Sequence, residues 1–258
     1  MKIDIESLAV SLAGRSVLHN LSLSIPSGAS AAILGVSGVG KTTLLRCVAG
    51  LLTPSAGLVL LGGRKPAELY GKGAMAFLFQ EACLWRHLTA RRTLELTFEL
   101  YGESIDDGCV QRLLERVGLG RFGEYYPHQM SVGMKARLAI ARAFCVAPSV
   151  LLMDEPFAAL DPLRRLDLNR QVQAMRREAG CTVMWVTHDV VEALQFATHV
   201  IALPHGPQAA EVVDLRSLPE ISDGANLPPE ALAMRDQLLN TIVGQEPVAD
   251  EASVEVLG

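Results

Sequence analysis

Short apolar segments alternate with segments of helical periodicity along most of the chain. Residues 30–34 and 150–153 are almost entirely apolar, which is typical of strands buried on both faces of a parallel sheet. Residues 131–145 and 163–178 repeat their apolar positions with the spacing of an amphipathic helix. Strands that alternate with helices in this way predict an α/β core. Further short strands are predicted over 58–61, 74–79, 182–186 and 200–203, and further helices over 43–49 and 190–197.

Two regions precede or interrupt this core. Residues 3–12 and 17–25 partly alternate apolar and polar positions, which predicts two strands at the start of the chain. Residues 81–145 form a mostly helical insertion, in which the helical pattern over 89–119 is interrupted by two glycines. The insertion therefore predicts a helical subdomain attached to the α/β core.

The end of the chain, residues 216–258, differs in character, and we expect it to be an extension of a main domain that covers 1–215. Within this extension, 227–243 could form one amphipathic helix. Residues 244–258 carry four acidic and no basic side chains, and we expect this tail to be mobile.

The bulk composition fits one large domain or a domain with a small subdomain, because the chain has 258 residues of which 50% are hydrophobic. Its formal net charge of -5 disfavours a general attraction to nucleic acid, so we expect no nucleic-acid partner. The first residues carry Asp4 and Glu6 and lack the apolar core of a signal peptide. No run approaches the roughly 18 apolar residues that span a bilayer, so any work at a membrane would require a partner protein.

The five cysteines are widely spaced and form no C-x-x-C pair, which argues against a zinc site and against a disulfide framework. We expect them to be buried, reduced thiols of a cytoplasmic protein. They are Cys47, Cys83, Cys109, Cys145 and Cys181.

The stretch GVSGVGKTT over residues 35–43 is the strongest candidate for chemistry, because it fits the phosphate-loop pattern G-x-x-x-x-G-K-[ST]. It lies between a predicted strand and a predicted helix, which is the setting that the pattern requires. Its glycines permit a tight turn that aims backbone N–H groups at phosphates, and the helix start adds positive charge. Lys41 would contact the β- and γ-phosphates and Thr42 would contact Mg²⁺; the alternative is a glycine-rich turn that binds nothing. The candidate nucleotide-binding residues are Gly35, Ser37, Gly38, Val39, Gly40, Lys41, Thr42 and Thr43.

A pair of acids, Asp154 and Glu155, follows the apolar strand 150–153. Acids at the carboxyl end of such a strand lie where α/β sheets bind their ligands, beside the phosphate loop. Asp154 would hold Mg²⁺, directly or through water, and Glu155 would polarise the water that attacks the γ-phosphate. The alternative is a solvated turn.

With these motifs the chain resembles the ATP-binding subunits of ABC transporters over residues 3–215. The resemblance implies a P-loop NTPase fold of ABC ATPase type, with a RecA-like α/β core, an N-terminal antiparallel β part and a helical subdomain at about 81–145. It also implies ATP hydrolysis, with ATP and Mg²⁺ as cofactors. The motifs that carry it occur in the family's order: GVSGVGKT, FLFQE with Gln80, YPHQMSVGMKARLAIARA over 126–143, VLLMDEP, FAALD with Asp161 and VTHD with His188.

The resemblance assigns roles to residues outside the phosphate loop. Gln80 would contact Mg²⁺ or the attacking water and would link the site to the helical insertion. Ser131 and Gly133 would face the γ-phosphate bound by a second copy of the chain. Asp161 would bridge the two copies and His188 would contact the γ-phosphate, so the implied unit is a head-to-tail dimer that encloses two ATP molecules. Taken singly, Gln80 could be a polar strand end, Asp161 a helix cap and His188 a capping or surface histidine.

Within the family, LLMDEPFAALDPLRR and TVMWVTHDVVEAL are similar to importer ATPases of the nitrate, sulfonate and taurine type. That similarity implies a membrane permease contacted through its coupling helices, a solute-binding protein, and a peripheral position at the cytoplasmic face of the inner membrane. Residues 83–88 resemble the surface that receives a coupling helix, although Leu84 and Trp85 could instead belong to the core. An export or lipid-moving ATPase and a soluble regulator without transport are the alternatives.

Two departures from the family pattern bear on the rate. Val132 stands in the signature region where the family usually has glycine. A positive φ there would strain this β-branched residue by about 1–3 kcal/mol and slow hydrolysis, whereas a negative φ would be harmless. Leu12 occupies the place of the aromatic residue that usually stacks on adenine, so we expect the base to be held mainly by apolar contact.

Overall fold

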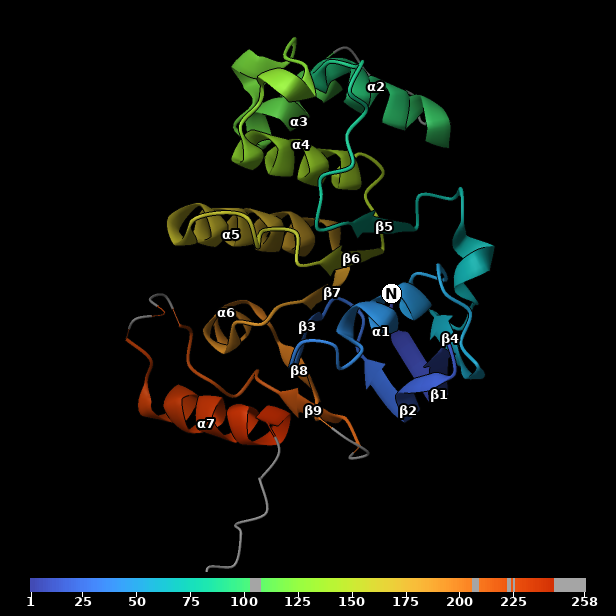
Figure 1. The fold of residues 1–258 in the computed structure, drawn as a ribbon. Helices are drawn as coiled ribbons and strands as arrows, with labels where there is room; N and C mark the ends of the chain where they lie inside the picture. Colours follow the sequence, from blue (N-terminus) through green and yellow to red (C-terminus); the bar gives the residue numbers. More distant parts are fainter. Residues whose placement is uncertain (103–107, 206–208, 222–223, 225, 244–258) are drawn as a thin grey trace, which may run out of the picture.

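A six-stranded sheet forms the centre of the computed structural model, which describes residues 1–102, 108–205, 209–221, 224 and 226–243 (Figure 1). In the order β5-β6-β7-β3-β8-β9, the first five strands run parallel and β9 joins the edge antiparallel. Every residue of β6, β7 and β8 is buried, and for β6 the apolar run over 150–153 predicts this burial. The sequence pattern does not predict β9, because only one of its residues is buried. The strands are β3 (Ser30–Gly35), β5 (Met75–Leu78), β6 (Val150–Asp154), β7 (Thr182–Val186), β8 (His199–Leu203) and β9 (Glu211–Asp214).

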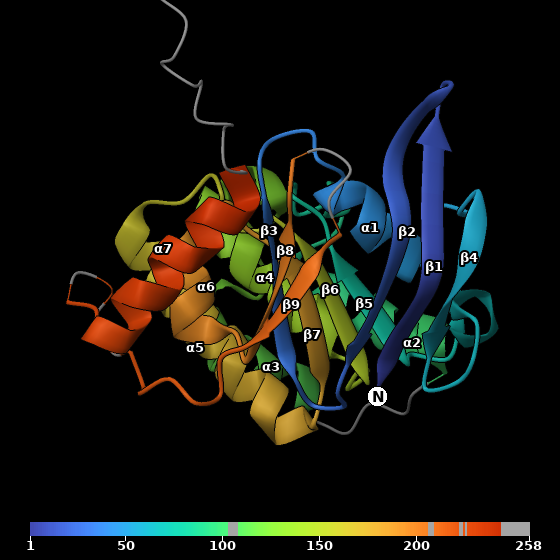
Figure 2. The same ribbon diagram turned by 90° about the horizontal axis from the view of Figure 1, so that it is seen from below.

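A second, antiparallel sheet confirms the predicted N-terminal β part. It consists of β2 (Arg15–Ile25), β1 (Ile3–Leu12) and β4 (Ala56–Leu61) in the order β2-β1-β4. The helix α1 (Lys41–Val48) contacts strands of both sheets, and Figure 2 shows it between them. Because the side chains of Leu44 and Leu45 are fully buried there, packing on two sides holds the start of α1 in place.

The insertion forms the predicted helical subdomain, which lies at one end of the molecule in Figure 1. Its helices are α2 (Ala90–Tyr101), α3 (Cys109–Arg116) and α4 (Val132–Phe144), and the short 3-10 turns η2 (Gly120–Phe122) and η3 (Pro127–Gln129) connect α3 to α4. Gly102 ends α2 with a left-handed φ of 69°, which explains why one predicted helical stretch becomes two helices. Since α4 contacts β5, this helix joins the subdomain to the central sheet.

The remaining helices cover the other part of the central sheet. They are α5 (Pro162–Ala179), α6 (Val190–Phe196) and α7 (Pro229–Val243), with a further 3-10 turn, η1 (Pro66–Leu69), after β4. The predicted helix 227–243 is confirmed as α7, which packs on α6 and β8 through buried Ala231, Leu238 and Ile242. The tail 244–258 lies outside the described residues, and the domain boundary at 215 stays a prediction. Within the described ranges, no helix combines the length and apolarity needed to cross a bilayer.

The cysteines do not all follow the prediction that they are buried. Cys47, Cys145 and Cys181 are buried, but Cys109 is half-buried and Cys83 is exposed in the loop after β5. The prediction is therefore wrong for Cys83, because an apolar neighbourhood in sequence does not fix which side a loop residue faces. Burial raises the pKa of Cys47 and Cys181 to about 11 and that of Cys145 to about 12.

Brief labelling of the folded protein with a maleimide near neutral pH is expected to modify Cys83 first. The raised pKa of Cys47 lowers its thiolate fraction by about 100-fold, and burial restricts access as well. Peptide mass spectrometry after a short exposure measures the order of reaction, and labelling in denaturant is the control in which all the thiols react. Modification of Cys47 as fast as Cys83 would contradict the described packing.

Candidate nucleotide site

The phosphate loop has the strand–loop–helix setting that the sequence predicts, between β3 and α1. Gly38 and Gly40 adopt left-handed φ values of 80° and 109°. A Cβ added at Gly40 would come within 2.8 Å of the Leu18 side chain, so both the conformation and the space require glycine there. The loop opens directly into the first turn of α1, whose free N–H groups favour an anion.

Lys41 lies inside this loop with only 8% of its surface exposed. Its Nζ donates to the carbonyl oxygens of Gly35 at 2.9 Å and Val36 at 3.0 Å. Burial lowers the pKa of Lys41, whereas the nearby charges of Glu155 and Asp154 raise it. The ammonium is thus held by weak carbonyl partners, and phosphate oxygens would be stronger ones.

Thr42 and Asp154 meet across the gap between α1 and β6. The Thr42 hydroxyl donates to Asp154 Oδ1 at 2.8 Å, and Asp154 is the buried last residue of β6. Two hard oxygen ligands beside a phosphate loop suit Mg²⁺. Gln80, the third predicted ligand, lies exposed two residues beyond the end of β5, and no hydrogen bond among the described residues joins it to Thr42 or Asp154.

Glu155 and His188 come together at the carboxyl ends of the neighbouring strands β6 and β7. Glu155 Oε2 lies 4.0 Å from His188 Nδ1, and the histidine side chain is 63% exposed. Glu155 adopts a left-handed φ of 44°, a conformation that costs about 1–3 kcal/mol for a residue other than glycine and that concentrates at functional sites. The structure therefore brings the candidate base and the candidate γ-phosphate contact to one place.

Comparison with known proteins identifies the family to which the chain belongs. The sequence matches the family described as ABC transporter over residues 18–158. The chain belongs to the ABC transporter family. It is 38% identical to the sulfate/thiosulfate import ATP-binding protein CysA of Synechococcus elongatus, over 82% of this chain and 61% of that protein. It is 37% identical to a putative ATP-binding protein of Brucella abortus biovar 1, over 98% of this chain and 97% of that protein.

Solved structures agree with this assignment. The ATP-binding cassette MJ0796, a dimer in a post-hydrolysis state with ADP and Pi, is similar with a TM-score of 0.73 and 28% identity, over 84% of this chain and 100% of that one. CbiO1 of Clostridium perfringens, part of the ABC transporter complex CbiONQ, has a TM-score of 0.68 and 26% identity, over 77% and 83%. The domain is thus of ABC ATPase type, a class that binds ATP with Mg²⁺ and hydrolyses it. The chain spans less than two thirds of the length of the CysA relative.

In this ABC domain, two further predicted residues cap helices. Asp161 Oδ1 accepts a hydrogen bond from Arg164 N at 3.1 Å at the start of α5, as its cap reading predicts. Ser131 Oγ accepts from Met134 N at 3.2 Å at the start of α4. His188 is not a cap, because Asp189 caps α6 instead. A cap role leaves Asp161 and Ser131 exposed, so a second copy of the chain could still reach them.

The predicted signature residues lie apart from the chain's own phosphate loop. In Figure 1, α4 lies in the helical subdomain, whereas α1, which follows the phosphate loop, lies beyond the central sheet. A Cβ added at Gly133 would meet no atom closer than 3.9 Å, so packing within one chain does not require glycine. Val132 begins α4 without a positive φ, which removes backbone strain as a reason for slow hydrolysis.

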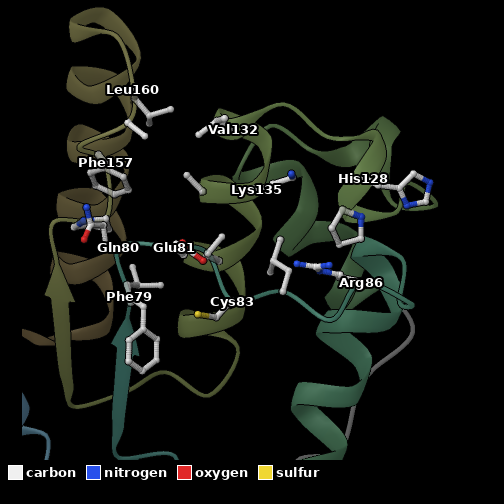
Figure 3. A pocket seen from close by; sticks show the side chains of 18 residues that line it. Phe79, Gln80, Glu81, Cys83, Arg86, His128, Val132, Lys135, Phe157 and Leu160 are labelled. Atoms are coloured by element: carbon white, nitrogen blue, oxygen red, sulfur yellow. The ribbon is translucent and has the colours of Figure 1, made fainter.

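A groove of about 670 Å³ runs between the end of β5, the start of α4 and the loop after β6. Figure 3 shows Gln80 beside Phe157 on one side of it, with Val132 and Lys135 of α4 facing them. Gln80 is therefore placed where the helical subdomain meets the catalytic edge of the sheet, as its predicted linking role requires, although that role stays a prediction.

A second cavity of about 520 Å³ borders Ser37 and Gly38 of the phosphate loop. Its other walls include Arg15, Val17 and His19, and Leu12 is not among its lining residues. Val17, Arg15 and His19 thus line the cavity beside the loop, and the apolar contact with adenine stays a prediction. Val17 lies on β2, and only the fold shows which residues of this strand face the loop.

Proposed function

We propose that this chain is the ATP-hydrolysing subunit of an ABC importer whose permease is a separate membrane protein. The observation that carries the hydrolytic part is the convergence of Lys41, the Thr42–Asp154 pair and the Glu155–His188 pair on one edge of the central sheet. Similarity to CysA supports import. Within import, the wording of the acidic and histidine motifs supports a nitrate, sulfonate or taurine type, with a solute-binding protein outside the membrane.

Each residue at this edge has a part in the proposed hydrolysis. Lys41 and the N–H groups of the loop bind and orient the phosphates, and Thr42 and Asp154 would hold Mg²⁺. The ion, when bound, would neutralise charge on the phosphate oxygens. Glu155 accepts a proton from the attacking water, and His188 contacts the γ-phosphate. Gln80 would contact Mg²⁺ or the attacking water and would link the site to the helical subdomain.

The proposed working unit is a head-to-tail dimer, with Ser131 and Gly133 of one copy facing the γ-phosphate of the other. Packing within one chain does not require glycine at 133, and this supports the arrangement. A phosphate group that approaches the backbone closely would leave no room for a side chain there. The exposed start of α4 would offer its N–H groups to that phosphate. Asp161, exposed at the start of α5, would contact the second copy.

The proposed permease site is an apolar groove of about 430 Å³ between the helical subdomain and the central sheet. Several of the exposed large apolar side chains of the molecule gather there, which marks an interaction surface. Trp85 lines the groove, 5.9 Å from the Arg142 guanidinium, whereas Leu84 packs against the core. The predicted surface 83–88 thus contributes its tryptophan. The exposed residues of the groove are Leu51, Tyr70, Phe79, Leu100 and Tyr101.

Capture of the tagged chain from detergent-solubilised native membranes is expected to recover a multi-span permease. The variant Leu100→Glu places a charge in the groove, where the wild-type leucine is 65% exposed, and is expected to lose the permease. Leu232→Glu, an exposed leucine on α7, is the matched control and should retain it. Mass spectrometry of the captured proteins and the unfolding temperature of each variant are measured together.

The identity of the partners separates the alternatives. A solute-binding protein recovered with the permease supports import, and its absence from a stable permease complex favours an export or lipid-moving system. Recovery of soluble partners alone, with the chain missing from the membrane fraction, would contradict the transport role and the proposed peripheral position at the cytoplasmic face.

A further inference from the structure

A cluster of buried polar side chains lies behind the Glu155–His188 pair, and no role above uses it. Glu192 of α6 accepts two hydrogen bonds, from Asn169 Nδ2 at 2.5 Å and from the Thr187 hydroxyl. Asn169 lies on α5 and is 2% exposed, and Thr187 is 4% exposed. The carboxylate therefore links the segment just before His188 to the helix that follows the acidic loop.

The Thr187 hydroxyl closes a turn around His188. While it donates to Glu192, it accepts a hydrogen bond from Asp189 N at 3.1 Å. The backbone N–H of Thr187 donates to Ile33 O at 3.3 Å, which ties the same turn to β3. Both neighbours of His188 are thus held, although the histidine side chain itself is exposed.

Arg165, also on α5, holds the other side of the site. Its Nη2 donates to the carbonyl oxygens of Ala158 and Leu160 at 3.4 and 3.3 Å, in the loop between Glu155 and α5. A small cavity of about 20 Å³ is bordered by Arg165, Glu192, Glu155 and His188 together. The helix α5 is therefore in contact both with the loop that follows Glu155 and, through Asn169 and Glu192, with the turn that carries His188.

A carboxylate is a costly group for this position if packing were its only purpose. Burial raises the pKa of Glu192, and the hydrogen bonds from Thr187 and Asn169 and the charge of Arg165 act against that rise. An apolar side chain would pack α6 on α5 without this desolvation. The two hydrogen bonds that Glu192 accepts, from Asn169 and Thr187, instead indicate that the carboxylate fixes the geometry of the turn around His188.

We propose that Glu192 is a positioning residue, which fixes the Thr187–Asp189 turn to α5 and thereby sets where His188 stands relative to Glu155. The inference rests on the proposed roles of Glu155 and His188. It concerns hydrolysis by the purified protein without its permease and does not depend on the direction of transport.

A charge swap between positions 169 and 192 tests the proposal on the purified full chain. Asn169→Asp places a second carboxylate against Glu192, and we expect kcat for ATP hydrolysis to fall about 10-fold or more, with KM for ATP changed less than about three-fold. Adding Glu192→Gln restores a pair of one amide and one carboxylate, with the carboxylate now at position 169 and the amide at position 192. The double variant should recover kcat to within about three-fold of wild type. Asn240→Asp, the same change at an exposed position on α7, is the matched control.

Rescue by the swap would show that the pairing of positions 169 and 192, and not either residue alone, sets kcat. The unfolding temperature of each variant, measured alongside, separates an effect on the rate from a change in stability. Failure of the double variant to regain kcat, or a parallel change of kcat and KM, would overturn the proposal. If Asn169→Asp does not fold, Thr187→Val removes only the hydroxyl and should also lower kcat with little change in KM. If Thr187→Val hydrolyses ATP at the wild-type rate while His188→Ala is slow, the positioning role of Glu192 is wrong but the role of His188 stands. If His188→Ala hydrolyses ATP at the wild-type rate, the role of His188, on which the inference rests, is wrong.

Discussion

Replacing Glu155 by glutamine is expected to slow ATP hydrolysis by about 10²- to 10⁴-fold while ATP binding persists. The side chain keeps its size, and the contacts of Lys41 with the phosphate loop and of Thr42 with Asp154 do not involve it. Only the carboxylate that could take a proton from water is lost. Single-turnover hydrolysis and equilibrium binding of ATP, measured on the same preparation, separate the two effects.

The same variant should accumulate a dimer when ATP is present, because the nucleotides would be enclosed and not cleaved. Size-exclusion chromatography with and without ATP and Mg²⁺ measures this directly. Glu230→Gln, an exposed glutamate on α7, is the matched control and should neither slow hydrolysis nor trap a dimer. Equal hydrolysis by wild type and Glu155→Gln would remove Glu155 from the role of base.

The placement of some site residues in the fold follows from local sequence. A strand, a glycine-rich loop and a helix start are contiguous, so the placement of Lys41 and Thr42 needs no long-range information. The same holds for Asp154 at the end of β6, since an unbroken apolar run ends there. The proximity of Glu155 and His188 could be inferred only through the family resemblance, because it depends on β6 and β7 being neighbours in the sheet.

Other features depend on packing that no local pattern reveals. In the sequence, Glu192 is indistinguishable from an ordinary polar residue of a short helix. Only the fold shows its contacts with Asn169 of α5 and with Thr187. Cys83 lies among apolar residues in sequence but faces outward in the loop after β5. The left-handed φ of Glu155 is similarly invisible in the sequence, because the favoured residue for such a conformation is glycine.

Replacing Lys41 by methionine is expected to weaken ATP binding by about 100-fold or more, since a buried charged partner of the phosphates is lost. Methionine keeps the apolar stem that packs inside the loop but offers no donor. Burial lowers the pKa of Lys41, so at neutral pH its charge costs the folded state free energy, and this cost falls only as the pH rises from the folded-state pKa towards the ordinary lysine pKa. The unfolding temperature of the nucleotide-free variant should therefore not fall below that of wild type.

Weaker ATP binding together with an unchanged unfolding temperature distinguishes the loss of a ligand contact from damage to the phosphate loop. Calorimetric titration with ATP and Mg²⁺ measures the affinity, and thermal unfolding without nucleotide measures the integrity of the domain. Lys72→Met, an exposed lysine beyond η1, is the matched control and should change neither quantity. Unchanged affinity would show that the N–H groups of the loop bind the phosphates without Lys41, while a large fall in unfolding temperature would show that its bonds to Gly35 and Val36 hold the loop together.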